Sequence, residues 1–260
     1  MIVVACAVLG LLVGSFLNVV IWRVPRGESV VSPPSHCPGC DNPISPRDNV
    51  PVLSWLLLRG RCRHCGEPIS ARYPAVELLT AGVFAAMGAR FGLSWALPAF
   101  LYLGAVSVAL ALIDLDHHRL PNALTLPSYP VGAVLLAGAA FAEADDPAHV
   151  LLRAALGMVI LWVVYYLLWW LSRGKGIGFG DVRLSGVLGL YLAYLGWDVW
   201  FTGWMLTFFA GGLFGIALIV LRRATRKSKV PYGPFMIVGS LVAVWVGAWI
   251  ADAYLGATVG

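Results

Sequence analysis

The chain begins with the run MIVVACAVLGLLVGSFLNVVIW, which covers residues 1–22, and Arg23 follows it directly. A run of about 20 apolar residues is long enough to cross the hydrocarbon core of a bilayer as one helix. No basic residue precedes this run, whereas Arg23 and Arg26 follow it, so it predicts a retained span and not a cleaved secretion signal. The N-terminus is therefore expected outside, and residue 23 inside.

Apolar runs of this kind recur along the whole chain. Of its 260 residues, 60% are hydrophobic and 12% are charged, and the mean hydropathy is +0.82. A soluble domain carries about 25% charged residues, so this chain lacks the polar surface that a water-soluble body needs. We expect an all-α polytopic membrane protein with about eight transmembrane helices. They are placed near residues 1–22, 74–89, 95–113, 124–141, 150–171, 184–196, 200–221 and 235–251.

The basic residues predict the orientation of these spans. If the first span runs from outside to inside, the cytoplasmic segments are roughly 23–73, 114–123, 172–183 and 222–234. They hold seven, one, three and five basic residues, which is 16 of the 18 in the chain. Because short loops rich in Lys and Arg stay on the cytoplasmic side, this orientation is favoured. The net charge of +5 then reflects topology, and with no nucleic-acid motif beside it we expect no nucleic-acid partner.

The segment 23–73 is the only sizeable soluble piece, and it carries four of the five cysteines. Cys37-Pro-Gly-Cys40 and Cys62-Arg-His-Cys65 are separated by 21 residues. Two such turns suit a tetrahedral zinc ion, so we expect a small cytoplasmic zinc-binding loop domain whose metal supplies much of its folding energy. Disulfides are disfavoured in the reducing cytoplasm, and the strand-helix context of a redox motif is absent. His36 or His64 replacing one cysteine stays an alternative.

Two carboxylates from distant parts of the sequence are expected at the same membrane face. Asp114 ends the third span, and Asp181 enters the sixth; the predicted orientation puts both at the cytoplasmic interface. Ionisable groups there are costly and usually functional. Two carboxylates held together share a proton, so one can activate water while the other protonates a carbonyl. Gly178 and Gly180 would let the backbone and a substrate approach closely.

Helix capping or pairing with nearby arginines is the structural alternative for these carboxylates, and it is the preferred interpretation of Asp116. His117 and His118 are interpreted as interface residues, because no serine or cysteine nucleophile is patterned beside them. Glu77, near the start of the second span, is a further candidate polar anchor.

Together these motifs resemble the bacterial type IV prepilin peptidases, which cleave a leader and also N-methylate the product. The resemblance runs from Gly10 to Pro234 in matching order. It is carried by Gly10–Val20, the paired cysteine turns, Arg72-Tyr73-Pro74 with Glu77, the stretch from Ala111 to Pro121, Gly178-Phe-Gly180-Asp181 (the GxGD motif) and Pro231-Tyr-Gly233-Pro234. One departure is Asn122, where the family commonly has Asp.

The resemblance implies a GxGD-type aspartyl protease in the bacterial inner membrane, with Asp114 and Asp181 as catalytic residues and the site facing the cytoplasm. Its substrates would be prepilins or pseudopilins of a type IV pilus or type II secretion system, cleaved after a glycine. The new N-terminal residue would receive a methyl group from S-adenosylmethionine, an activity that the resemblance associates with the four-cysteine loop.

We accordingly predict a first span at 1–22, a cysteine loop at 23–73 and a seven-helix peptidase domain at 74–260. Two other classes of function fit parts of this pattern. A proton-coupled or ion transporter also uses membrane carboxylates, but no internal repeat of spans is evident. A zinc-dependent membrane scaffold would leave the aspartates and the GxGD motif unexplained.

Overall fold

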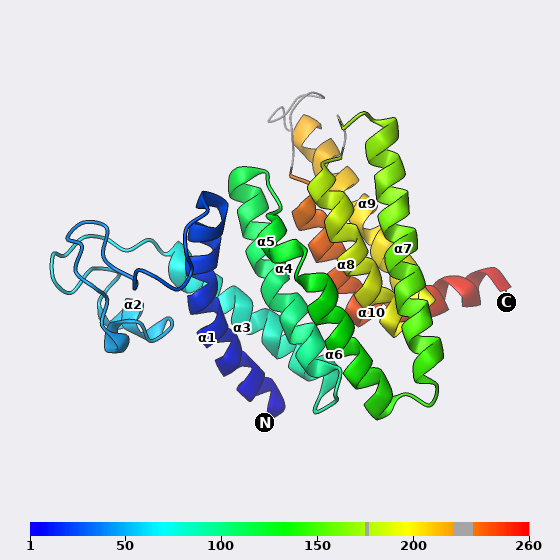
Figure 1. Cartoon of the computed structure of the whole chain (residues 1–260), viewed down its shortest axis with the longest axis horizontal. Helices are drawn as coiled ribbons and strands as arrows, with labels where there is room; N and C mark the ends of the chain where they lie inside the picture. The colour runs from blue at the N-terminus through cyan, green and yellow to red at the C-terminus, as the bar shows by residue number, and fades with distance from the viewer. Residues whose placement is uncertain (175–176, 221–230, 260) are drawn as a thin grey trace. The chain divides into compact units, whose positions relative to one another are not determined.

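The computed structural model describes residues 1–174, 177–220 and 231–259, and every regular element in those ranges is helical (Figure 1). This confirms the predicted all-α class. The α-helices are α1 Ile2–Arg23, α2 Leu53–Leu57, α3 Arg72–Phe91, α4 Leu97–His117, α5 Asn122–Thr125, α6 Ser128–Glu143, α7 Pro147–Leu171, α8 Phe179–Leu195, α9 Trp197–Val220 and α10 Gly233–Val259. Two 3-10 turns are η1 Val24–Arg26 and η2 Pro46–Asp48.

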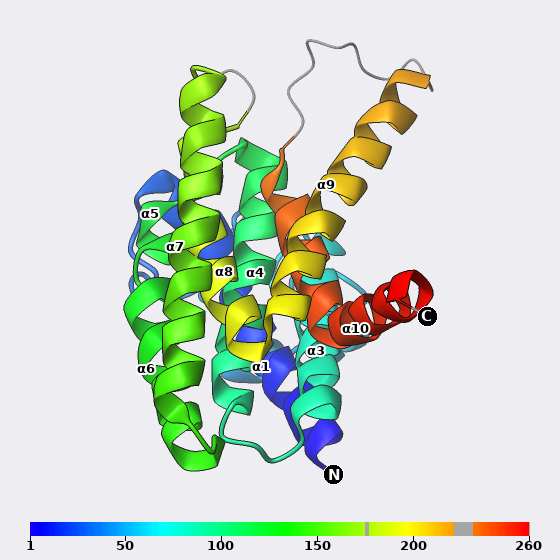
Figure 2. The same cartoon turned by 90° about the vertical axis from the view of Figure 1, so that its right-hand side faces the viewer.

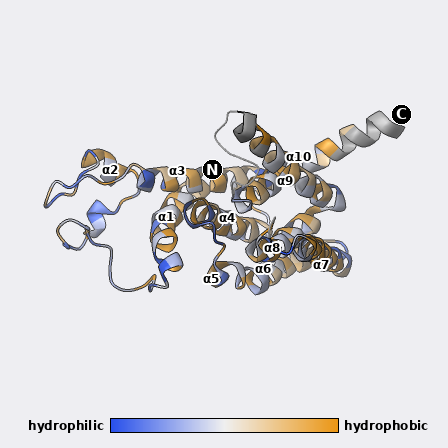
Figure 3. Cartoon of the chain, turned by 90° about the horizontal axis from the view of Figure 1, so that it is seen from above, coloured by the Kyte–Doolittle hydropathy of each residue, from blue (hydrophilic) through white to orange (hydrophobic). Residues whose placement is uncertain are grey.

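Each predicted span coincides mainly with one helix, and among the described residues five segments are long and apolar enough to cross a membrane. These five are α1 with η1, α4, α5 with α6, α7, and the first 18 residues of α10. Large apolar side chains are exposed on them; on α7, Leu152 is 60% exposed and Trp170 is 61% exposed. Figure 3 shows hydrophobic colour on the helices and much hydrophilic colour on the segment around α2. The chain is therefore a multi-pass membrane protein.

The contacts divide the chain into two compact units, Met1–Ala109 and Leu110–Gly260, with the boundary inside α4. In the first unit α1 and α3 pack against each other through small residues (Figures 1 and 2). A Cβ atom at Gly14 would lie 2.7 Å from Cα of Glu77, and one at Gly10 would lie 2.7 Å from Cα of Ala81. Close backbone approach of this kind is typical of helix pairs in membranes.

In the second unit α8 is the most enclosed helix, with neighbours α6, α7, α9 and α10. Its residues from Leu184 to Ala193 are all buried. At Gly157 on α7, a Cβ atom would lie 2.2 Å from Cβ of Ala193. The side chains of α8 therefore pack mainly on those of neighbouring helices.

The start of α8 differs from the prediction. We expected the sixth span to begin near Leu184, but the helix starts at Phe179, with Gly178 as its N-cap. The glycines indicated a connecting loop, whereas Gly180 lies in the first turn of α8, where it packs closely on Leu120. Of the basic residues used for the orientation, six lie outside the described residues: Lys175, Arg222, Arg223, Arg226, Lys227 and Lys229.

Candidate catalytic and metal-binding sites

The two aspartates of interest are buried in the same unit. Asp114 lies in the last turn of α4 and is 5% exposed, and Asp181 lies in the first turn of α8 and is 8% exposed. Their carboxylates interact electrostatically, so the fold brings the two positions together. Asp116 and His117, two and three residues after Asp114, are exposed and stay outside this buried pair.

Each carboxylate is held at the N-terminus of a helix. Oδ2 of Asp114 accepts a hydrogen bond of 3.1 Å from the N–H of Gly233, the first residue of α10. Oδ2 of Asp181 accepts one of 2.9 Å from the N–H of Gly178, the N-cap of α8. The backbone N–H groups and the dipole at a helix N-terminus favour negative charge. Asp181 therefore caps the start of α8 through Oδ2, and its Oδ1 takes no part in this hydrogen bond.

Leu120 is the point at which the three motif segments meet. A Cβ atom at Gly180 would lie 3.0 Å from Cβ of Leu120, and one at Gly233 would lie 3.3 Å from Cδ2 of Leu120. The same added atom at Gly233 would lie 2.8 Å from Oδ2 of Asp114. The glycines are therefore needed because the ends of α4, α8 and α10 approach closely around Asp114.

Asn122, the departure from the family pattern, contacts the start of α8. Its Oδ1 accepts a hydrogen bond from Nη1 of Arg183, two residues after Asp181. The hydroxyl of Tyr129 donates to the carbonyl oxygen of Arg183 at 2.6 Å. The α5–α6 segment thus fixes the first turn of α8 from outside the carboxylate pair.

Sequence reasoning missed a buried tyrosine beside the carboxylates. Tyr165 on α7 is 1% exposed, and its hydroxyl interacts electrostatically with Asp181 and with the hydroxyl of Tyr232. The two tyrosine rings have centroids 6.4 Å apart. Tyr232 lies in a motif already noted, but Tyr165 stands in an uninterrupted apolar run where it looks like a core residue. Only its polar hydroxyl in such a run could have drawn attention to it.

The four loop cysteines form a cluster in the first unit. Their Sγ atoms all lie within 4.8 Å of one another, and those of Cys37 and Cys65 are 3.7 Å apart. A tetrahedral zinc site with Zn–S bonds of about 2.3 Å requires sulfur atoms about 3.8 Å apart, so the cluster fits this metal. All five cysteines of the chain are free thiols, and in the described ranges the cluster holds the four cysteines without His36 or His64.

The two cysteine turns have the same backbone geometry. The carbonyl oxygen of Cys37 accepts from the N–H of Asp41 at 2.8 Å, and that of Cys62 accepts from the N–H of Gly66 at 3.0 Å. Asp41 and Gly66 both have positive φ, 55° and 75°. The segments 37–45 and 62–70 share the pattern C-x-x-C-x-x-P-I-S. This short repeat was missed in the sequence, and it predicts two equivalent metal-binding turns.

Two thiols of the cluster have pKa values that are shifted in opposite directions. Backbone N–H groups of Cys65 and His64 lower the pKa of Cys62 to about 6. The backbone N–H of Glu67 lowers the pKa of Cys65, but loss of solvent and the neighbouring sulfurs outweigh it and raise that pKa to about 12. Four adjacent thiols therefore do not all ionise unless a cation compensates their charge.

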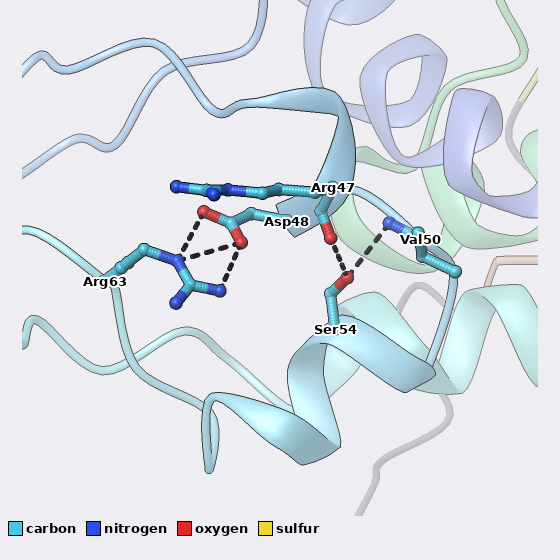
Figure 4. A network of polar contacts seen from close by, with 5 residues as sticks. All are labelled: Arg47, Asp48, Val50, Ser54 and Arg63. Carbon is cyan, nitrogen blue, oxygen red and sulfur yellow. Dashed lines mark hydrogen bonds and ion pairs between the residues drawn. The ribbon is translucent and has the colours of Figure 1, made fainter.

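Ion pairing and hydrogen bonds tie the second turn to the segment between the turns (Figure 4). Nη2 of Arg63 lies 2.7 Å from Oδ1 of Asp48, and this hydrogen bond lowers the pKa of Asp48. The hydroxyl of Ser54 donates to the carbonyl oxygen of Arg47 and accepts from the N–H of Val50. The loop is thus ordered by polar contacts in addition to any metal.

Glu77 connects this loop to the helix pair α1–α3. It is 7% exposed, and its Oε2 accepts a hydrogen bond of 2.7 Å from the N–H of Val52. Val52 has a φ of 61°, which is strained for a β-branched residue and persists only where its surroundings fix it. The expectation that Glu77 is a polar anchor agrees with this contact.

Comparisons with known proteins give two family matches and several full-length relatives. Residues 8–91 match the bacterial peptidase A24 N-terminal domain, and residues 101–220 match the type IV leader peptidase family. Proteins named prepilin leader peptidase/N-methyltransferase are 38% identical in Aeromonas hydrophila, 35% in Stutzerimonas stutzeri and 34% in Pseudomonas aeruginosa. These alignments cover 94–97% of this chain and 91–93% of each relative. No solved structure matches significantly.

Proposed function

Because the chain belongs to the type IV leader peptidase family, we propose that it is a membrane aspartyl endopeptidase with Asp114 and Asp181 as its catalytic carboxylates. It removes the short basic leader of prepilins or pseudopilins after a glycine, at the cytoplasmic face of the inner membrane. The observation that carries this proposal is the burial of both carboxylates at adjoining helix N-termini, with glycines closing around them.

The two carboxylates divide the acid and base work. Two buried carboxylates that interact cannot both be ionised cheaply, so the pair shares one proton. The ionised member takes a proton from water as the water attacks the scissile carbonyl, and the protonated member donates to the carbonyl oxygen. Gly178 leaves room for an extended substrate beside Asp181, whereas the space at Gly180 is filled by Leu120. Helix N–H groups hold each carboxylate in a fixed orientation during these transfers.

Asparagine substitution tests the pair directly. Asp114→Asn and Asp181→Asn each remove a group needed for proton transfer, so cleavage of a prepilin by the purified protein is expected to fall at least 1000-fold, about the scale of losing an essential acid or base. The matched control is Asp116→Asn, an exposed neighbour, which is expected to cleave at the wild-type rate. Substantial cleavage by either of the first two variants in membranes would overturn the assignment.

We further propose that the chain N-methylates the new N-terminal residue with S-adenosylmethionine and that one zinc ion on Cys37, Cys40, Cys62 and Cys65 orders the cysteine loop. The names of the relatives include both activities. The fit of the four sulfur atoms to a tetrahedral ion supports the zinc. The role of the metal is structural, because four protein ligands leave no open position for substrate.

Metal analysis of cysteine variants tests the zinc site. Wild-type protein is expected to hold about one zinc per chain, and Cys37→Ser or Cys62→Ser is expected to lose most of it. Cys6→Ser changes a cysteine outside the cluster and serves as the control that keeps the metal. A full complement of zinc in both cluster variants would argue against ligation by four cysteines.

A further inference from the structure

The first unit contains a cavity of about 890 Å³ that the peptidase chemistry does not use. It lies between the two cysteine turns and the adjoining ends of α1 and α3, and all its lining residues fall between positions 15 and 77. Its size is within the range of about 300–1,000 Å³ found for small-molecule and cofactor sites. The cavity is therefore large enough for a nucleoside-sized ligand without any residue of the second unit.

Polar groups are concentrated at the helix ends that form one side of the cavity. Glu77 is the buried carboxylate there, and Asn18 lies on the facing helix, with its Nδ2 3.2 Å from the carbonyl oxygen of Tyr73. Arg23 is 8% exposed and also lines the cavity; its Nη1 donates to the carbonyl oxygen of Ser29 at 2.9 Å. A carboxylate and a guanidinium are thus both held in place by protein contacts.

Aromatic surface forms another part of the lining. Trp55 and Tyr73 both line the cavity. The indole N–H of Trp55 donates to the carbonyl oxygen of Ile69 at 2.9 Å, which fixes the ring on the second cysteine turn. A flat purine base is bound by such surfaces through stacking, while the polar groups of a nucleoside need partners such as carboxylate and guanidinium.

We propose that this cavity is the binding site for S-adenosylmethionine, with Glu77 as its anionic anchor. The inference deepens the proposed methyltransferase activity and rests on it. The donor combines an adenine ring, a ribose diol, a carboxylate and two positive charges. The lining supplies aromatic rings for the first, Arg23 for the carboxylate, and Glu77 for the hydroxyl or cationic groups. The cavity is thus complementary to the donor in size and in charge.

The chemistry that the donor supplies is a single displacement. The amine of the cleaved product first releases a proton to solvent, and its nitrogen then attacks the methyl carbon. A nitrogen–carbon bond forms, and the sulfur–carbon bond breaks with its electron pair left on sulfur as a neutral thioether. The protein's part is to bind and orient the two reactants.

The structural alternative is that Glu77 only anchors the loop. Its Oε2 holds the N–H of the strained Val52, and this contact alone would justify a buried carboxylate. A glutamine retains a carbonyl oxygen that accepts the same hydrogen bond but lacks the charge. Glu77→Gln therefore separates the two roles, because anchoring needs an acceptor and binding of a cation needs the negative charge.

Photo-crosslinking on the wild-type protein locates the donor. The purified full chain is irradiated with radiolabelled S-adenosylmethionine, and the labelled peptides are identified by mass spectrometry. Label is expected on peptides within residues 15–77, above all those containing Trp55 or Tyr73, and excess S-adenosylhomocysteine should prevent it. Specific label on peptides of the second unit would overturn the site while leaving the methyltransferase activity standing.

Equilibrium binding of radiolabelled S-adenosylhomocysteine and S-adenosylmethionine measures the role of Glu77. Glu77→Gln is expected to weaken donor binding at least tenfold, with zinc content and prepilin cleavage kept. Asp145→Asn makes the same chemical change at an exposed position in the second unit and should bind like wild type. Unchanged affinity in Glu77→Gln would overturn the anchor. Wild-type protein that neither binds the donor nor methylates product would instead contradict the proposed second activity.

Discussion

At the scale of single residues, small side chains set the geometry of the carboxylate pair as much as the aspartates do. Gly233 donates its N–H to Asp114 and at the same time leaves the space that Oδ2 of Asp114 occupies. Another donor could replace the hydrogen bond to Asp114, but any side chain at position 233 would crowd its carboxylate. Gly233 is therefore expected to be as sensitive to substitution as a residue that takes part in the chemistry.

Gly233→Ala tests this expectation. Its Cβ atom would lie 2.8 Å from Oδ2 of Asp114, so the carboxylate has to move by several tenths of an ångström. Because small misplacements of a reacting group are costly, cleavage should fall tenfold or more while the protein remains folded. Gly212→Ala is the matched control, since nothing lies within 4 Å of the added atom there. Equal rates for the two variants would show that the space around Asp114 is adaptable.

Tyr165→Phe tests a residue that positions the pair without reacting. The hydroxyl lies among Asp181 and Tyr232 inside the protein, and its removal deletes a polar partner while the buried ring stays. We expect kcat for prepilin cleavage to fall about tenfold and KM to stay within twofold. The dependence of kcat on pH should also change, because the hydroxyl interacts with Asp181. Tyr166→Phe, on the adjacent half-buried tyrosine that stacks on Trp162, is the control. A change in KM alone would assign Tyr165 to substrate binding.

At the scale of elements, the pairing of α1 with α3 prepares the first unit for its loop. Cys6, Gly10 and Gly14 follow one another at intervals of four residues and face α3, where their neighbours include Gly88, Ala81 and Glu77. This spacing puts small residues on one face of α1, and lipid supplies no hydrophobic force to bring helices together. The close packing of α1 on α3 therefore fixes the position of Glu77 relative to the loop that it contacts.

Gly14→Ala is expected to separate the two helices. The added atom would lie 2.7 Å from Cα of Glu77, which is backbone and cannot rotate away. Overpacking of this kind costs about 1–3 kcal/mol, so the thermal midpoint in detergent should fall by several degrees. Gly82→Ala on α3 adds its methyl to open space and should match or slightly exceed wild type. No difference between the variants would mean that the helices tolerate a wider spacing.

At the scale of the whole molecule, two family matches and two compact units divide the chain similarly. The N-terminal match covers residues 8–91 of the first unit, and most of the peptidase match at 101–220 lies in the second. Helix α3 groups with α1 in this division. The functional boundary that we predicted at residue 73 stays a prediction, as does the orientation across the membrane.

Labelling of introduced cysteines in intact cells tests that orientation. With the N-terminus outside, the exposed Asp145 after α6 lies outside the membrane and the exposed Asp116 at the end of α4 lies in the cytoplasm. A membrane-impermeant thiol reagent should therefore label Asp145→Cys above the wild-type background and leave Asp116→Cys unlabelled until the cells are lysed. The reverse pattern would invert the topology and put the carboxylate pair on the outer face.

The sequence by itself determined the helical class, the approximate position of the long helices, the four cysteines and the two aspartates. These follow from local signals: apolar runs, charge flanks and short spacings are properties of neighbouring residues. The opening run of residues 1–22 is the clearest example, because its length and flanks require a helix whatever it packs against.

Only the tertiary structure decided which groups meet. The bond from Gly233 to Asp114 joins residues 119 positions apart, and Tyr165 reaches Asp181 from a run that looks entirely apolar. The cavity beside Glu77 likewise exists only once the cysteine turns fold over the ends of α1 and α3. Contacts of this kind depend on helix packing, in which close approach is allowed by small residues scattered along the chain. A short-range pattern can mark a helix face for close approach, but it does not say which distant segment meets that face.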